Sequence, residues 1–191
     1  MQDSVNQLRK RNRELRAELD AVTLDRAARN LGELICSMPE YAQAERIAAY
    51  FAVNGEISLD FVIDQALEQG KQIYLPNLDH EALRFAPYSR QQKMRINRFK
   101  LPEPDVSDDE MLEPEALDLA LVPLVVFDSI RNRIGMGGGF YDRSFAFRKD
   151  PDRSSPILIG VAHELQKVER LVPEPWDVRL DIIATDQGIF R

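Results

Sequence analysis

Apolar and polar positions repeat along the chain with two different periods, and these periods predict where strands and helices lie. Apolar runs of strand length, bounded by proline, glycine or polar residues, recur from residue 46 onward. The predicted strands cover residues 46–53, 72–75, 83–86, 119–127, 157–162 and 182–185. Helical patterns lie between them, so we expect parallel strands joined by right-handed crossovers.

The first part of the chain has a helical period. Four apolar residues recur on one face: Leu8, Leu15, Leu19 and Val22. No proline interrupts the segment before Pro39, so one helix is predicted over residues 5–37. A further helix is predicted over residues 59–69, with Ser58 as its N-cap and Gly70 at its end.

Together these elements predict a three-layer α/β/α sandwich with a mainly parallel sheet, folded as a single domain over residues 1–191. In such sheets, ligands bind beyond the carboxyl ends of the strands. Residues 102–114 are rich in proline and acidic side chains, which predicts a surface loop within the domain. The composition of residues 105–115 permits a lid over the ligand site.

Composition narrows the function classes. The 191 residues include one cysteine, Cys36, which excludes an internal disulfide and is expected to be a core thiol in a reducing compartment. A formal charge of −7 argues against broad nucleic-acid binding. No apolar run approaches the roughly 20 residues that span a bilayer. We therefore expect a cytoplasmic monomer that binds small molecules, with neither nucleic acid nor membrane as a partner.

One glycine-rich loop carries most of the candidate chemistry. Four of the nine glycines lie within residues 135–139, between the predicted strand 119–127 and a helix expected to start at Tyr141. This order of elements points backbone N–H groups and a helix dipole at one spot, which suits phosphate. The glycine spacing fits neither common phosphate-loop pattern, so a tight surface turn is the alternative.

Charged residues beside the loop favour a nucleotide triphosphate over that turn. Arg133 and Arg143 can bind phosphate oxygens, and the carboxylate of Asp142 can bind Mg²⁺. No Ser/His/Asp order, Cys/His pair or zinc spacing occurs, so covalent or zinc-based catalysis has no support in the sequence. The remaining pattern is that of electrostatic catalysis of phosphoryl transfer.

Residues 132–143, Asn-Arg-Ile-Gly-Met-Gly-Gly-Gly-Phe-Tyr-Asp-Arg, resemble the signature Arg-Leu-Gly-x-Gly-Gly/Lys-Gly-Tyr-Tyr-Asp of the 5-formyltetrahydrofolate cyclo-ligase family. Weaker matches extend the resemblance over nearly the whole chain, at the basic first helix and at residues 51–56, 74–76, 102–104, 123–128, 163 and 176–177. The resemblance implies a layered fold similar to the CoA-transferase and ribose-phosphate isomerase type. It also implies an ATP-dependent ligase of one-carbon metabolism, which converts 5-formyltetrahydrofolate to 5,10-methenyltetrahydrofolate, ADP and phosphate by phosphorylating the formyl oxygen.

The resemblance assigns four sets of residues. The ATP-binding set is Arg9, Lys10, Arg133, Gly135, Met136, Gly137, Gly138, Gly139, Phe140 and Tyr141. The folate-binding set is Phe51, Glu56, Met136, Gly137, Gly138, Gly139 and Phe140. The implied Mg²⁺ ligands are Asp142 and Asp177, with Asp181 as a competitor for the second position. The catalytic set is Arg133, Tyr141 and Arg143.

Several of these residues also have simpler interpretations. Arg9, Arg13 and Arg16 share a helix face, which would be a solvated basic face without the resemblance. Glu56 alone would be a solvated loop acid, and a structural role is the alternative for His163. Tyr141 could instead pack under its helix, and Trp176 is either a packing residue or a cleft wall.

The chain departs from the family pattern at Val5, where a lysine usually stands four residues before the arginine matched by Arg9. This departure supports a non-catalytic paralogue that binds a nucleotide or a folate, which is the alternative function. A sugar-phosphate isomerase on a similar sheet is a third possibility, and it would bind no ATP.

Overall fold

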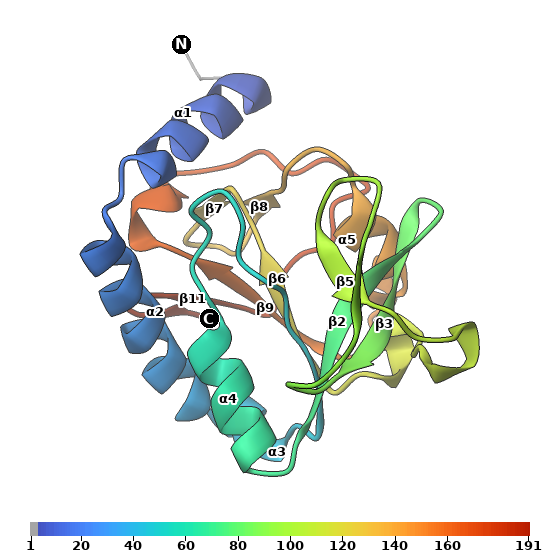
Figure 1. The fold of residues 1–191 in the computed structure, drawn as a ribbon. Coiled ribbons are helices and arrows are strands. Elements are labelled where there is room, and N and C mark those ends of the chain that lie inside the picture. The colour runs from blue at the N-terminus through green and yellow to red at the C-terminus, as the bar shows by residue number, and fades with distance from the viewer. Residues whose placement is uncertain (1–3) are drawn as a thin grey trace.

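The computed structural model describes residues 4–191 and has a seven-stranded sheet at its centre (Figure 1). Its strands are β1 (Arg46–Ala48), β2 (Gln72–Asp79), β3 (Ala82–Tyr88), β6 (Leu119–Pro123), β9 (Ile157–Ala162), β11 (Ile182–Thr185) and β12 (Ile189–Phe190). The spatial order is β12-β11-β9-β6-β1-β2-β3. All neighbours pair in parallel except the edge strands β3 and β12, which confirms the predicted mainly parallel α/β fold.

Two small sheets accompany the large one. One pairs β4 (Met94–Ile96) with β5 (Pro102–Pro104), and the other has the order β10 (Lys167–Val168), β7 (Val126–Asp128), β8 (Arg133–Ile134). The prediction of a surface loop over residues 102–114 was therefore wrong at its start. Glu103 in β5 is buried because the side chains of Arg95 and Asn97 bond its carboxylate.

The predicted strand 119–127 is divided between the large and the small sheet. β6 ends at Pro123, whose ring nitrogen cannot donate a ladder hydrogen bond. Two residues later, the N–H of Val125 donates to the carbonyl of Ile134 at 2.8 Å, which starts the small sheet. An apolar run that is buried throughout cannot reveal such a change of partner.

The helices are α1 (Val5–Ala17), α2 (Ala21–Cys36), α3 (Pro39–Gln43), α4 (Asp60–Glu68) and α5 (Phe140–Ser144). Short 3-10 turns follow at Asp108–Glu110, Pro114–Ala116, Ala146–Lys149 and Glu164–Gln166. The prediction of one helix over residues 5–37 was wrong, because Asp20 accepts a hydrogen bond from the N–H of Thr23 at 2.7 Å and caps a second helix. The predicted buried apolar face was also wrong, because Val22 is 76% exposed whereas Asn12 and Arg16 are the buried residues of α1.

Two predicted strand ends moved, whereas the end of the second predicted helix did not. The strand predicted over 46–53 stops at Ala48. The strand predicted to end before Pro76 continues through it as β2. Because β1 pairs with β2 only as far as Tyr74, Pro76 does not need an N–H group for a ladder hydrogen bond on the β1 side. The strand predicted over 83–86 is β3, which lies at one edge of the sheet. α4 ends as predicted before Gly70, whose φ of +76° is left-handed.

The sheet separates two apolar layers. α2, α3 and α4 pack on one face, where Leu31, Ile35 and Val62 meet inward-facing strand residues such as Ile47 and Ile159. The opposite face is covered by α5 and by the irregular chain before β11, on the side of the sheet away from α2 and α4 (Figure 1). No helix within residues 4–191 has the length and apolar character required to cross a membrane.

Candidate active site

A cleft of about 770 Å³ lies where the parallel strands β1, β2 and β6 end. It is lined by Val5 and Arg9 of α1 and by parts of residues 50–56, 75–83, 97–102, 123–124, 132–142 and 171–177. The position beyond the carboxyl ends of parallel strands is the one predicted for a ligand site. Segments from both halves of the chain therefore share one cavity.

The glycine loop forms one wall of this cleft. Gly137 and Gly139 have φ values of +104° and +67°, which disfavour other residues. A Cβ on Gly138 would lie 2.8 Å from the ring of Phe140, so a side chain there would require that ring to move. The Nε–H of Arg9 donates to the carbonyl of Gly135 at 2.9 Å. The first helix and the glycine loop, distant in sequence, are thus joined at the cleft.

Charged side chains meet at the base of the loop. Arg133 Nη2 donates to Asp142 Oδ1 at 2.6 Å, and the N–H of Val178 donates to the same oxygen at 3.0 Å. The second bond brings the chain of Asp177 beside Asp142, and both aspartates line the cleft. Asp181 instead accepts two bonds from Arg148 at 2.8 and 2.9 Å and does not line the cleft. Of the two competing carboxylates, the structure therefore brings only Asp177 to the cleft.

These carboxylates can take part in a shared metal site and do not form one by themselves. Within residues 4–191, no group of three or more His, Cys, Asp or Glu side chains is placed to hold a metal ion. Mg²⁺ usually binds one or two carboxylates together with substrate phosphates and water. Asp142 and Asp177 are two carboxylates that line the cleft beside the glycine loop, so they are the candidates for such a site.

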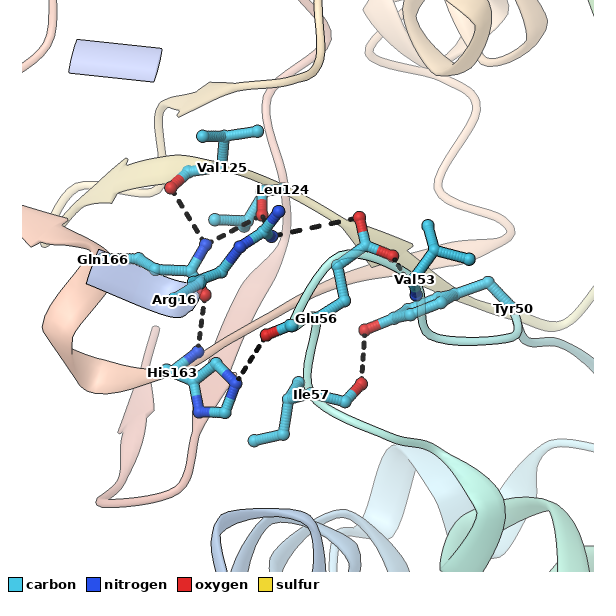
Figure 2. Close-up of polar contacts among 10 residues, drawn as sticks. Arg16, Tyr50, Val53, Glu56, Ile57, Leu124, Val125, His163 and Gln166 are labelled. Carbon is cyan, nitrogen blue, oxygen red and sulfur yellow. Dashed lines mark hydrogen bonds and ion pairs between the residues drawn. The ribbon is translucent and has the colours of Figure 1, made fainter. Parts of the chain in front are cut away.

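Glu56 lines another part of the cleft, in a tight turn after β1. Its Oε2 accepts from the N–H of Val53 at 3.1 Å, and its Oε1 lies 3.9 Å from Arg16 Nη1. Figure 2 shows the guanidinium of Arg16 directed at this carboxylate. The side chain of Glu56 is only 10% exposed, and burial raises its pKa, opposed by the Val53 bond and by Arg16. A partly desolvated acceptor therefore faces the cleft.

Aromatic side chains complete the walls. Phe51 packs edge-on against Tyr88, with ring centroids 5.4 Å apart, and it lines the cleft beside Glu56. Tyr141 stacks on Phe145 at 6.2 Å, and burial raises the pKa of its hydroxyl. Tyr141 lines the cleft and packs under its helix, which confirms the packing interpretation, whereas its catalytic role stays a prediction.

Some predicted residues lie outside the cleft. The ammonium of Lys10 is 3.9 Å from Glu14 on the same helix, and the lysine side chain is 80% exposed. Arg143 borders a smaller hollow behind the loop, where it donates to the carbonyls of Glu81 and Gly138, each at 2.6 Å. Val5, which replaces the family lysine, does line the cleft.

The structure adds wall residues that the sequence interpretation missed. Phe99 and Leu101, on the hairpin between β4 and β5, line the cleft, and the ring of Phe99 meets that of Phe140 edge-on at 5.6 Å. Phe99 is 51% exposed. The sequence feature that could have identified Phe99 as a cleft residue is a large apolar side chain among the polar residues 97–100. Residues 171–174 also line the cleft, and no motif marks them.

Fold and cleft together define a class of protein. The class is that of α/β enzymes, with one cleft lined both by a glycine loop with cations and by a largely buried carboxylate with aromatic rings. A profile of the 5-formyltetrahydrofolate cyclo-ligase family matches residues 1–186. The chain belongs to that family, which confirms the resemblance and the predicted ligase.

Individual relatives agree. The sequence is 37% identical over 182 residues to 5-formyltetrahydrofolate cyclo-ligase of Haemophilus influenzae, covering 93% of this chain and 96% of the relative. It is 34% identical over 156 residues to the Escherichia coli protein of that name, covering 80% and 84%. The NMR structure of Aquifex aeolicus 5,10-methenyltetrahydrofolate synthetase is similar with a TM-score of 0.84 at 27% identity, covering 98% of this chain and 92% of that chain.

Proposed function

We propose that the chain catalyses the ATP-dependent cyclisation of 5-formyltetrahydrofolate to 5,10-methenyltetrahydrofolate, with release of ADP and phosphate. One observation supports this assignment most directly: the glycine loop with Arg9 and Arg133, and the Glu56 turn with Phe51, line one and the same cleft. Family membership supplies the identity of the two substrates. Because one chain lines the whole cleft, we also propose a monomer as the active unit, working in the cytoplasm.

The formyl oxygen is a poor leaving group until it is phosphorylated. In the proposed reaction it attacks the γ-phosphorus of ATP, N10 then attacks the formyl carbon, and phosphate leaves as the five-membered ring closes. The glycine-loop N–H groups with Arg9 and Arg133 would bind the phosphates. Glu56 would accept from pterin N–H groups between the rings of Phe51 and Phe99. This arrangement holds N10 against the activated carbon, which makes ring closure intramolecular.

Mg²⁺ fits the residues at the base of the loop. Asp142 and Asp177 would hold it together with phosphate oxygens, as this ion prefers. When bound, the ion neutralises charge that develops on the transferred phosphoryl group. Arg133, already paired with Asp142, is placed to orient that carboxylate and to meet the same phosphates. Tyr141 and Arg143, the sequence neighbours of Asp142, are the other proposed catalytic residues; Tyr141 lines the cleft and Arg143 borders the smaller hollow behind the loop.

The assay is direct. Purified protein is mixed with 5-formyltetrahydrofolate and MgATP, and the near-ultraviolet absorbance of the methenyl product is followed, with ATP omitted in the control. ATP-dependent growth of this band is expected. Binding of ATP or folate without any product would contradict the proposal and identify the non-catalytic paralogue, in which case Val5 is the first position to restore to lysine.

A further inference from the structure

Arg16 is the side chain in the molecule whose burial is hardest to explain by packing alone. It lies in α1, is 1% exposed, and cannot lose its charge as a buried lysine can. Its Nη1 donates to the carbonyl of Leu124 at 3.4 Å, whereas its Nε and Nη2 have no hydrogen-bond partner among the described residues. Unsatisfied buried donors are costly, and an apolar side chain of similar size would avoid that cost.

The same guanidinium faces the carboxylate that lines the cleft. Arg16 Nη1 is 3.9 Å from Glu56 Oε1, and both groups are largely removed from water (Figure 2). Coulombic attraction between such groups is much stronger than between exposed ones. We propose that Arg16 is a positioning residue, which keeps the Glu56 carboxylate ionised and directed into the folate side of the cleft. The inference rests on the proposed function and adds the residue through which Glu56 acts.

Other contacts fix the turn and leave the charge of Glu56 unbalanced. A ring nitrogen of His163 bonds the carbonyl of Gly55 at 3.2 Å, and the hydroxyl of Tyr50 donates to the carbonyl of Ile57 at 3.0 Å. A Cβ on Gly55 would lie 2.9 Å from the carbonyl oxygen of Arg16, so helix and turn are in close contact. These bonds hold the backbone. Arg16 is the contact that opposes the carboxylate charge.

The titratable groups around Glu56 come from four elements. Arg16 belongs to α1, Tyr50 follows β1, Tyr141 belongs to α5 and His163 follows β9. Burial raises the pKa of both tyrosines and lowers the pKa of His163, so these three are neutral near pH 7. Within the described residues that face Glu56, Arg16 is therefore the cation that favours its ionised form.

Removal of that cation has a consequence that depends on pH. Burial raises the pKa of Glu56, and Arg16 opposes this rise, so Arg16→Met lets the pKa of Glu56 rise further. Below its pKa, each added unit reduces the carboxylate fraction about tenfold. Folate affinity of Arg16→Met should therefore fall relative to wild type by about tenfold for each unit by which the raised pKa of Glu56 exceeds the pH, so the deficit should be larger at about pH 6 than at about pH 8.5. Protonation of the folate changes its affinity for both proteins equally, so this effect cancels in the ratio of the two affinities at each pH.

Trp176 supplies the readout. It is the chain's one tryptophan and lines the cleft, so its fluorescence is expected to report binding of 5-formyltetrahydrofolate. Arg16→Lys keeps a cation and should recover much of the affinity and the wild-type pH dependence. Arg29→Met, which removes an exposed arginine from α2, is the matched control and should bind as wild type does. ATP affinity, measured separately, should change little in all three variants.

A double mutant separates positioning from mere support of the fold. If Arg16 acts through Glu56, Arg16→Met should cost little further folate affinity in a Glu56→Gln background. The double variant also removes both buried charges, so it remains usable where Arg16→Met alone fails to fold. A pH-independent loss in Arg16→Met, or additive losses in the double variant, would overturn the inference. Wild-type protein that binds no folate and forms no product would instead contradict the proposed function itself.

Discussion

The two walls of the cleft are built in different ways. The glycine-loop wall, residues 133–142, is one continuous segment whose middle is exposed. The Glu56 wall consists of residues 50–57 together with Arg16 and His163, which come from three distant parts of the chain, and both Arg16 and His163 are buried. Backbone conformation gives the first wall its chemistry. Tertiary contacts give the second wall its chemistry.

The difference follows from what each wall is proposed to bind. Phosphate oxygens are met by N–H groups and mobile cations, which a short glycine-rich segment can present locally. A heterocycle needs an acceptor that is desolvated and fixed in direction, and such a group is costly unless other segments supply its bonds and counter-charge. α1 joins the walls, because Arg9 bonds the glycine loop and Arg16 faces Glu56 two turns later.

The largest effect on turnover is expected for Asp142, the proposed ion ligand beside the glycine loop. Asp142→Ala should reduce MgATP-dependent turnover by roughly a hundredfold or more, since it removes a proposed ion ligand. It also leaves Arg133 buried without its carboxylate, which costs about 3–5 kcal/mol when a buried pair is broken. Asp142→Asn is the companion variant, because its amide oxygen can still accept from Arg133. Full turnover in folded Asp142→Asn, titrated with Mg²⁺, would remove the metal assignment.

The sequence predicted one wall far better than the other. Gly135 to Asp142 are contiguous, and their glycines and charges mark a candidate phosphate loop without any tertiary information. Arg16 was noted only as part of a basic face, because a helical period cannot tell that a charged position is buried against Glu56. The break between α1 and α2 was missed for a related reason, since the cap at Asp20 competes with an uninterrupted helical pattern.

A pair of substitutions should separate the walls kinetically. Arg9→Met removes a cation and the bond to Gly135, so the KM for ATP should rise by about tenfold while the KM for folate changes little. Glu56→Gln should produce the reverse pattern, because a neutral amide replaces the acceptor for the pterin. Initial rates with each substrate varied in turn provide the measurement. Equal changes in both constants would show that the two walls do not bind separate substrates.

The glycine-loop wall should also be sensitive to backbone conformation alone. Gly139→Ala places a Cβ 2.6 Å from Arg143 Nη1 at a φ of +67°. Gly70→Ala is a matched control, because its φ is +76° and no atom lies within 4 Å of the added Cβ. Both variants should lose about 1 kcal/mol of stability from the left-handed backbone. Only Gly139→Ala should weaken ATP binding, by several-fold; equal ATP affinity in the two variants would argue against the loop as the phosphate site.

The smallest effect concerns the pH dependence of the Glu56 wall. Burial lowers the pKa of His163 below its usual value near 6.5, so the unfolded chain takes up a proton on this residue before the folded one does as pH falls. His163 therefore makes the folded state less stable below about pH 6.5, with a slope of at most about 1.4 kcal/mol per pH unit. The raised pKa of Glu56 acts in the opposite direction, since stability from that group is lost as pH rises above about 4.5.

A histidine comparison isolates the first of these contributions. Urea unfolding of wild type and His163→Asn between about pH 5 and 7.5 should show a flatter profile in the variant, because Glu56 is present in both proteins and cancels. His80→Asn is the control: His80 is exposed and has a φ of +53°, a conformation that asparagine tolerates. Its profile should follow that of wild type. If His163→Asn followed it as well, the turn at Gly55 would not depend on a buried neutral imidazole, and the Glu56 wall would depend on Arg16 alone for its electrostatics.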